Sequence, residues 1–278
     1  MFQPFSLNIG GELREYSRPQ VMGIINVTPD SFFKSSRTMD EDALASRIEK
    51  FIADGADFID MGAYSSRPGA ADVDPAEEIA RLRVGMKVLR SIDPQIPVSI
   101  DTFRSEVARV AIEELGANIV NDISGGSLDQ DMFRTVARLK VPYILMHMRG
   151  TPATMQSLTD YSDVTADVIA DLSVKLRELH LLGVADVVVD PGFGFSKTTE
   201  QNFEMMRNLQ QFEVLGCPLL VGISRKSMIT RTLDIDPADA LAGTVALDAF
   251  ALTQGAAFLR VHDVLEAVQT VKLFMKTF

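Results

Sequence analysis

The feature that most constrains the fold is a short apolar run that recurs eight times along the chain, each time followed by a segment with helical periodicity. The clearest example is residues 187–190, where three valines precede Asp190 and a loop containing Pro191 and two glycines. A β-branched run without polar alternation is typical of a parallel strand covered on both faces. A lone Asp-Pro-Gly would more simply start a turn. The repetition instead favours a carboxylate at the carboxyl end of a strand, where α/β proteins bind ligands.

The order of these units predicts a barrel. Strands are expected at residues 21–26, 58–61, 98–101, 119–122, 143–147, 187–190, 219–223 and 258–261. Helices are expected around residues 44–55, 75–91, 103–116, 130–139, 168–183, 202–212, 237–253 and 264–275, the last with Val264, Val268, Val271 and Met275 on one stripe. Eight strand–helix units predict one α/β domain over residues 1–278, a (β/α)8 TIM barrel with a short N-terminal β-hairpin at residues 5–16 that plugs one end. A doubly wound sheet is the alternative, and it is disfavoured because no G-x-G-x-x-G follows the first strand.

Composition narrows the class of function. A net charge of −11 without a cluster of Lys and Arg argues against a nucleic-acid partner. The least polar stretch, residues 240–259, is interrupted by Asp248 and Gly255, so no membrane span is expected. The single cysteine, Cys217, excludes an internal disulfide framework. Together with an N-terminus that lacks a secretory pattern, it predicts a cytoplasmic protein.

Polar side chains follow most of the predicted strands, and a barrel would gather them at one mouth. They are Asn26, Asp60, Asp101, Asn121, Asp122, His147, Asp190, Lys226, Arg260 and His262, with apolar Ile123, Met146 and Phe195 among them. Carboxylates and amides beside aromatic rings suit a flat, nitrogen-rich heterocycle, because a carboxylate can accept two parallel N–H bonds. The cations suit a phosphate or a carboxylate. Asp60 and Asp122 have an alternative role as structural hydrogen-bond acceptors, and His180, in the middle of a helix, is left out of the site.

The loops after the strands carry seven motifs: NVTPDSF at 26–32, SSRPG at 65–69, SIDT at 99–102, NDI at 121–123, DPGFGF at 190–195, SRKS at 224–227 and RVHD at 260–263. Together, and in this order, they resemble the dihydropteroate synthase family from about residue 21 to the C-terminus. The resemblance implies a homodimeric, Mg²⁺-dependent transferase of folate biosynthesis and a sulfonamide target. Its substrates would be 6-hydroxymethyl-7,8-dihydropterin pyrophosphate and p-aminobenzoate, joined by dissociative substitution to give 7,8-dihydropteroate and pyrophosphate.

The resemblance also implies roles for individual residues. The pterin ring would be bound by Asp101, Asn121, Ile123, Met146, Asp190, Phe195, Gly222 and Lys226. Pyrophosphate would be held by Asn26, Arg67, Arg260 and His262, with Asn26 also binding the metal. p-Aminobenzoate would contact Phe32, Ser66, Pro68, Phe195, Lys226 and Ser227. The residues acting in catalysis would be Asp101, Asp190, Lys226, Arg260 and His262. Asp101 and Asp190 would stabilise a cationic ring, and Arg260 and His262, together with Arg67 and Mg²⁺, would neutralise the leaving group.

The chain departs from the family pattern at two places. Ser66 stands where threonine is usual, and Phe33-Lys34-Ser35-Ser36 replaces an acidic, glycine-rich turn. Three other functions stay open on the residues alone. A corrinoid-dependent methyltransferase domain would share the barrel and the Asp/Asn slot, a Schiff-base aldolase could use Lys226, and a non-catalytic pterin-binding protein would have the same pocket.

Overall fold

The structure, a computed structural model, describes residues 2–27, 37–64 and 73–278. Eight parallel strands form one sheet in the order β8-β7-β6-β5-β4-β3-β10-β9. An isolated parallel bridge between Val189 and Leu219 joins its two edges, so the sheet is a nearly closed barrel. The strands are β3 (Gln20–Asn26), β4 (Phe58–Gly62), β5 (Val98–Asp101), β6 (Ile119–Asp122), β7 (Tyr143–Met146), β8 (Val187–Asp190), β9 (Leu220–Val221) and β10 (Phe258–Val261). The predicted (β/α)8 barrel is confirmed.

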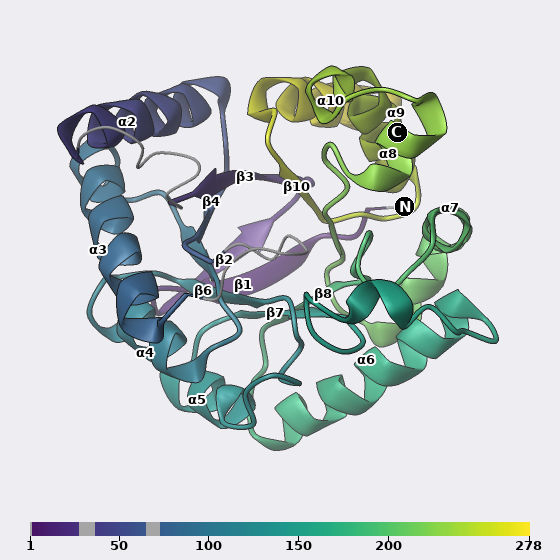
Figure 1. The fold of residues 1–278 in the computed structure, drawn as a ribbon, viewed down its shortest axis with the longest axis horizontal. Helices are drawn as coiled ribbons and strands as arrows, with labels where there is room; N and C mark the ends of the chain where they lie inside the picture. The colour runs from purple at the N-terminus through teal and green to yellow at the C-terminus, as the bar shows by residue number, and fades with distance from the viewer. Residues whose placement is uncertain (1, 28–36, 65–72) are drawn as a thin grey trace.

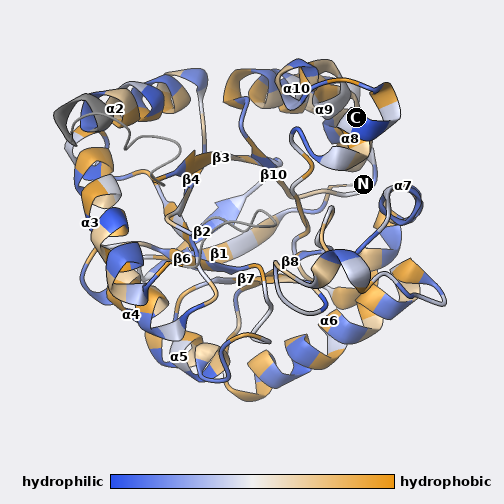
Figure 2. Ribbon diagram, viewed as in Figure 1, coloured by the Kyte–Doolittle hydropathy of each residue, from blue (hydrophilic) through white to orange (hydrophobic). Residues whose placement is uncertain are grey.

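Helices form a ring outside the strands (Figure 1). Among the described residues they are α2 (Arg37–Asp54), α3 (Pro75–Ile92), α4 (Ser105–Glu113), α5 (Met132–Leu139), α6 (Val164–Leu181), α7 (Thr199–Arg207), α8 (Ser227–Leu233), α9 (Leu241–Thr253) and α10 (Val264–Thr277). Three short 3₁₀ helices add η1 (Met155–Ser157), η2 (Leu209–Leu215) and η3 (Pro237–Asp239). Hydrophobic and hydrophilic residues alternate along the helices, as expected for helices with one face on the barrel and one on solvent (Figure 2). Within the described ranges, no helix is long and apolar enough to span a membrane.

Two helix predictions need correction, and one short helix was not predicted. The helix expected at 202–212 begins at Thr199, because the Thr198 hydroxyl and Gln201 cap each other's backbone N–H groups, and it gives way after Arg207 to η2. The short helix α8 was not predicted. The last helix does not bury Met275, which is 42% exposed, but Phe274, which is 8% exposed.

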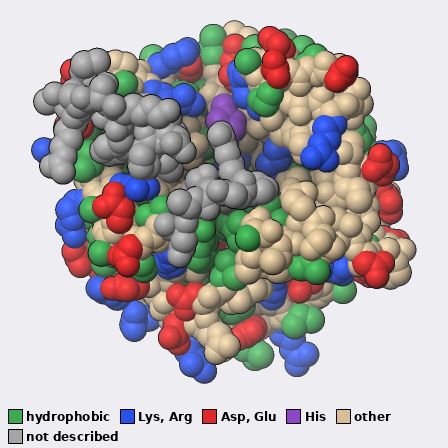
Figure 3. Space-filling model, viewed as in Figure 1, with side chains coloured by type: hydrophobic (Ala, Val, Ile, Leu, Met, Phe, Trp, Pro, Cys, Tyr) green, Lys and Arg blue, Asp and Glu red, His purple; other side chains and the backbone are tan. Residues whose placement is uncertain are grey.

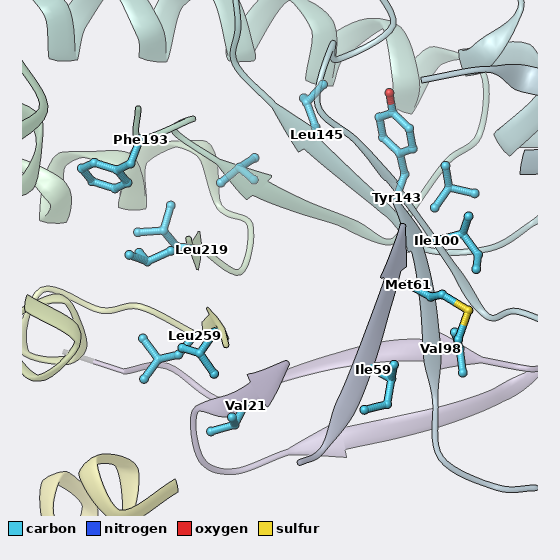
Figure 4. Packing of buried hydrophobic residues seen from close by; sticks show 14 of the residues in the cluster. Val21, Ile59, Met61, Val98, Ile100, Tyr143, Leu145, Phe193, Leu219 and Leu259 are labelled. Carbon is cyan, nitrogen blue, oxygen red and sulfur yellow. The ribbon is translucent and has the colours of Figure 1, made fainter. Parts of the chain in front are cut away.

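Outward-facing strand residues pack under the helices and form the main core. Figure 4 shows part of it, with Val21, Ile59, Met61, Val98, Ile100, Tyr143, Leu145, Leu219 and Leu259 labelled along successive strands. Full burial of each large aliphatic side chain contributes about 1.5–3 kcal/mol. The acidic and basic side chains lie mainly toward the periphery of the face seen in Figure 3.

The N-terminal hairpin closes the barrel at the amino ends of the strands. Its strands are β1 (Phe5–Ile9) and β2 (Glu12–Tyr16), which pair antiparallel. The hairpin buries Leu7 and Ile9 against the first inward-facing layer of the barrel, which consists of Met22, Phe58, Ile119, Ile144, Val188, Leu220 and Phe258. This inward-facing layer is called the apolar floor below. Aromatic contacts add to its packing, and the ring centroids of Phe5 and Phe258 are 5.2 Å apart. The hairpin therefore plugs one end, as predicted, and leaves the carboxyl ends of the strands as the mouth.

Candidate active site

The inside of the barrel becomes polar one layer above the apolar floor. Side chains alternate across a strand, so the residue two positions after each floor residue also points inward. In β4, β6, β8 and β10 these residues are Asp60, Asn121, Asp190 and Arg260. Registers between neighbouring strands keep them at similar heights, as with Asp101 opposite both Gly62 and Asn121. The sheet thus assembles a buried polar layer that faces the mouth.

Arg260 links two carboxylates from different strands. Its Nε donates to Asp60 Oδ2 at 2.7 Å, and its Nη2 donates to Asp101 Oδ2 at 2.7 Å. Asn121 Nδ2 also donates to both oxygens of Asp60, at 3.3 Å each. Burial raises the pKa of Asp101 to about 7, although Arg260 opposes the shift. Arg260, predicted for the anion, and Asp101, predicted for the heterocycle, are therefore one hydrogen-bonded unit.

Asp190 and Lys226 form the opposite side of this layer. Asp190 is 5% exposed, and its Oδ1 accepts the Gly192 N–H at 2.8 Å. The hydrogen bond found for this carboxylate among the described residues involves Oδ1, so Oδ2 can accept a bond from a ligand. Burial raises the pKa of Asp190, with Lys226 opposing. Burial lowers the pKa of Lys226 to about 8, with Asp190 opposing, and its Nζ donates to the Phe193 carbonyl at 2.5 Å.

An apolar wall stands beside these polar groups. Ile123 and Met146 are buried together with Met148 and Met155, and Phe195 packs against them. Lys226 Nζ lies 4.8 Å from the centroid of the Phe195 ring. Gly222, whose lack of a side chain leaves room, is buried directly after β9, two positions beyond the floor residue Leu220. A flat ring can lie against this wall while its edge meets the carboxylates.

Other predicted residues lie around the rim. Asn26 ends β3 and is partly buried, and Ser227 begins α8 and is exposed. His262 Nδ1 is 3.0 Å from Ser224 Oγ. Burial and, to a smaller extent, repulsion from the Arg260 charge lower the pKa of His262 to about 4. At neutral pH this side chain is therefore uncharged and offers one N–H donor. Phe32, Ser66, Arg67 and Pro68 lie outside the described residues.

Two further residues, Asp122 and His180, lie outside the layer that faces the mouth. Asp122 is fully buried and accepts hydrogen bonds from Ser124 N, Gly126 N and the Tyr143 hydroxyl at 2.7, 2.8 and 2.7 Å. His180 is exposed on α6, in agreement with its omission. Asp60 was predicted at the mouth with a structural alternative and was not assigned to a ligand; the structure shows it accepting hydrogen bonds from Arg260 and Asn121. Strand alternation from Phe58 points its side chain into the barrel.

Few of the described side chains at the mouth of the barrel could bind a magnesium ion. Among the described residues no group of three or more His, Cys, Asp or Glu side chains could hold a metal ion. Asn26 offers one amide oxygen. Mg²⁺ commonly keeps several waters and binds substrate phosphates with one or two protein ligands. The donor set therefore fits a metal that arrives with a phosphate ligand, and does not form an all-protein cage.

Comparison with known proteins extends over nearly the whole chain. A family model described as pterin binding enzyme matches residues 22–262. Dihydropteroate synthase of Synechocystis is 41% identical over 97% of this chain and 94% of its own length. The chain is 42% identical to Folic acid synthesis protein fol1 of Pneumocystis carinii but spans only 37% of that longer protein. The solved structure of Xanthomonas albilineans dihydropteroate synthase with 4-aminobenzoic acid superposes with a TM-score of 0.89 at 34% identity, covering 98% of this chain and 97% of that one.

Proposed function

Because this chain belongs to the pterin-binding enzymes, and within them to the dihydropteroate synthase family, we propose that it is a transferase of folate biosynthesis. It condenses 6-hydroxymethyl-7,8-dihydropterin pyrophosphate with p-aminobenzoate to give 7,8-dihydropteroate and pyrophosphate. The observation that carries this proposal is the inward-facing polar layer of Asp60, Asp101, Asn121, Asp190 and Arg260 beside an apolar wall.

The pterin ring fits between the polar layer and the apolar wall. Asp190 has a free Oδ2 beside an occupied Oδ1, and it can accept N–H groups from the amidine-like edge of the ring. Asp101, Asn121 and Lys226 provide further acceptors and donors at the same level. Ile123, Met146, Phe195 and Gly222 form the flat sides of the slot.

The pyrophosphate group is assigned to the rim. Arg260 contributes its guanidinium, which two carboxylates already partly neutralise, and His262 contributes a neutral N–H. Asn26 and Arg67 complete the proposed set. Mg²⁺, held by Asn26 and the pyrophosphate oxygens, would supply additional charge neutralisation on the leaving group.

p-Aminobenzoate is assigned to the space outside the pterin. Phe195 and Lys226 border this space from the β8 and β9 sides, and the exposed Ser227 lies at the start of α8. Phe32, Ser66 and Pro68 complete the proposed pocket. Sulfonamides resemble p-aminobenzoate and would occupy the same place.

The chemistry needs no nucleophile from the protein. The C–O bond to pyrophosphate breaks, and its electron pair leaves with the pyrophosphate. The exocyclic methylene becomes cationic in conjugation with the electron-rich dihydropterin, and the buried carboxylates of Asp101 and Asp190 stabilise that charge. The aniline nitrogen of p-aminobenzoate then forms the C–N bond and loses a proton. The low dielectric of the slot strengthens each of these charge interactions.

A homodimer in the cytoplasm completes the proposal. Exposed apolar side chains on α8, α9 and α10 favour a subunit contact there, among them Leu233, Phe250 and Leu273 at 52, 40 and 70% exposure. Cys217 is free, as expected in a reducing compartment. Light scattering on the purified protein measures the mass and tests the dimer.

A pyrophosphate-release assay with and without p-aminobenzoate tests the reaction. The expected result is release that depends on p-aminobenzoate, with 7,8-dihydropteroate identified by mass and inhibition by a sulfonamide. Methyl transfer to a corrinoid, or a borohydride-trapped adduct on Lys226 with a carbonyl substrate, would support the competing enzymes. Pterin binding without any product would support a binding protein.

A further inference from the structure

The loop that follows β8, residues 191–197, is buried but has no regular structure. Gly192, Gly194 and Ser196 have φ angles of +73, +80 and +50°, so every second residue is left-handed. A Cβ on Gly192 would lie 2.0 Å from the carbonyl oxygen of His147, which makes glycine obligatory there. The loop backbone therefore rests directly on the end of β7 and must satisfy its own polar groups without a ladder.

Side chains satisfy the carbonyl groups of this loop one after another. Lys197 Nζ donates to the carbonyls of Gly192 and Phe195 at 3.0 Å each. Lys226 Nζ donates to the Phe193 carbonyl, and Gln156 Nε2 lies 3.4 Å from the Gly194 carbonyl. Two lysines thus bind three carbonyl groups of the loop, and one of them, Lys226, also borders the proposed pterin slot.

Lys197 has a complete set of partners. It is 4% exposed, and its third contact is His147 Nδ1 at 3.0 Å. Burial, with repulsion from Lys197, lowers the pKa of His147 to about 2, so the imidazole is neutral and Nδ1 can accept. Burial lowers the pKa of Lys197 itself, but three acceptors match the three N–H donors of an ammonium group and favour its charged form.

The residue before Lys197 provides a second anchor to the same neighbour. Ser196 Oγ accepts the Arg149 N–H at 2.8 Å and donates to the Arg149 carbonyl at 2.9 Å. Ser196 and Lys197 therefore fix the carboxyl half of the loop to the segment after β7. Phe195, directly before them, is the residue that faces Lys226.

We propose that Lys197 is a positioning residue for the reaction, which acts by binding the Gly192 and Phe195 carbonyls and so holds Phe195 against Lys226. This inference rests on the proposed function, because Phe195 and Lys226 border both the pterin slot and the p-aminobenzoate space. Lys197 contacts no substrate. Without its ammonium group, the Phe195 carbonyl and the His147 ring nitrogen lose this donor, and the Gly192 carbonyl keeps only the Phe195 N–H at 3.1 Å. We therefore expect the loop to rearrange.

The test compares Lys197→Met, which keeps most of the apolar stem, with Lys197→Arg, which keeps a charged donor. A displaced wall is expected to raise the KM for p-aminobenzoate and to lower kcat/KM by about 100-fold, while the arginine variant recovers part of the loss. Lys175→Met is the matched control, because Lys175 is also a lysine near His147 but pairs with Asp171 on α6. It is expected to keep the wild-type constants.

A role in stability alone predicts a lower melting temperature with unchanged KM and kcat per folded enzyme, and that result would overturn the proposal. If Lys197→Met does not fold, Lys197→Gln replaces it. Its amide is shorter and has two N–H donors for three acceptors, so at least one bond is lost and the KM for p-aminobenzoate should still rise. A wild-type KM in that variant would also overturn the proposal. Calorimetric titration with a pterin tests the loop independently of turnover. A wild-type protein that binds pterin without forming dihydropteroate would refute the proposed function. Loss of pterin affinity in Lys197→Met would even then support the positioning role of Lys197.

Discussion

Replacing Arg260 by methionine removes the cation that Asp60 and Asp101 share. The Arg260 side chain is 18% exposed, and those of Asp60 and Asp101 are 0 and 20% exposed, so water replaces little of what is lost. Breaking a buried ion pair from one side costs about 3–5 kcal/mol, and we expect a loss of that size in the free energy of unfolding at pH 9. Arg83→Met is the control, because its pair with Glu114 is 55 and 46% exposed and surface pairs contribute about 0–1 kcal/mol.

The pH dependence makes this prediction specific. The pKa of Asp101 in the folded protein, about 7, lies above its ordinary value of 3.8. The folded state therefore binds this proton more tightly, and the contribution of Asp101 to stability is fully present below about pH 4 and lost as the pH rises through 7. Loss of Arg260 raises this pKa further, so the deficit of the variant should grow between pH 7 and 9. Urea unfolding at pH 6 and pH 9 measures it, and an equal deficit at both pH values would refute the reasoning.

Three further predictions concern single carboxylates and the pH profile. Asp190→Asn puts a donor where the pterin needs an acceptor, and this mismatch costs about 1–3 kcal/mol. Calorimetry should therefore show pterin affinity lower by about 10- to 100-fold. Unchanged affinity would mean that Asp190 has a structural role only. Asp248 is buried with Oδ1 unpartnered and its pKa raised by burial. Its stabilising effect is lost as the pH rises, so Asp248→Ala should raise the melting temperature at pH 8 more than at pH 5, and a lower melting temperature at both would count against this. The plot of kcat/KM against pH should rise near 7 with Asp101 and fall near 8 with Lys226, and Asp101→Asn should lose the acid limb.

Much of the fold could be predicted because strand and helix periodicity are local. The predicted limits of β5, β6 and β8 match the structure, since these short runs rich in Val and Ile each end in an aspartate. The errors arose where local signals were short or depended on neighbours. The helix α8 has only seven residues and starts inside a polar motif. Met275 and Phe274 are adjacent and both apolar, so only packing decides which of them is buried.

The sequence could predict which residues gather at the site, but not which of them bind one another. Strand ends identified Asp101, Asn121, Asp190, Lys226 and Arg260 as neighbours at the mouth. The bond between Arg260 and Asp60 joins residues 200 positions apart and follows from the height of each strand in the barrel, which the sequence does not state. Lys197 lies two positions after the motif at residues 190–195. Its three partners depend on a loop shape that forms only against the end of β7, so the sequence did not identify its role.

The barrel closes least firmly beside the site. β9 has two residues, its ladder to β10 has two pairs, and its connection to β8 is the isolated bridge at Val189 and Leu219. Short pairings open locally at low free energy, and amide hydrogens report such opening by exchanging with solvent. We expect the amides of residues 219–222 to exchange faster than those of β5 and β6. Gly222 and Lys226 follow β9 closely in the chain, so the proposed pterin slot borders the part of the barrel that opens most easily. Pterin binding should therefore slow amide exchange at residues 219–222 more than elsewhere in the sheet.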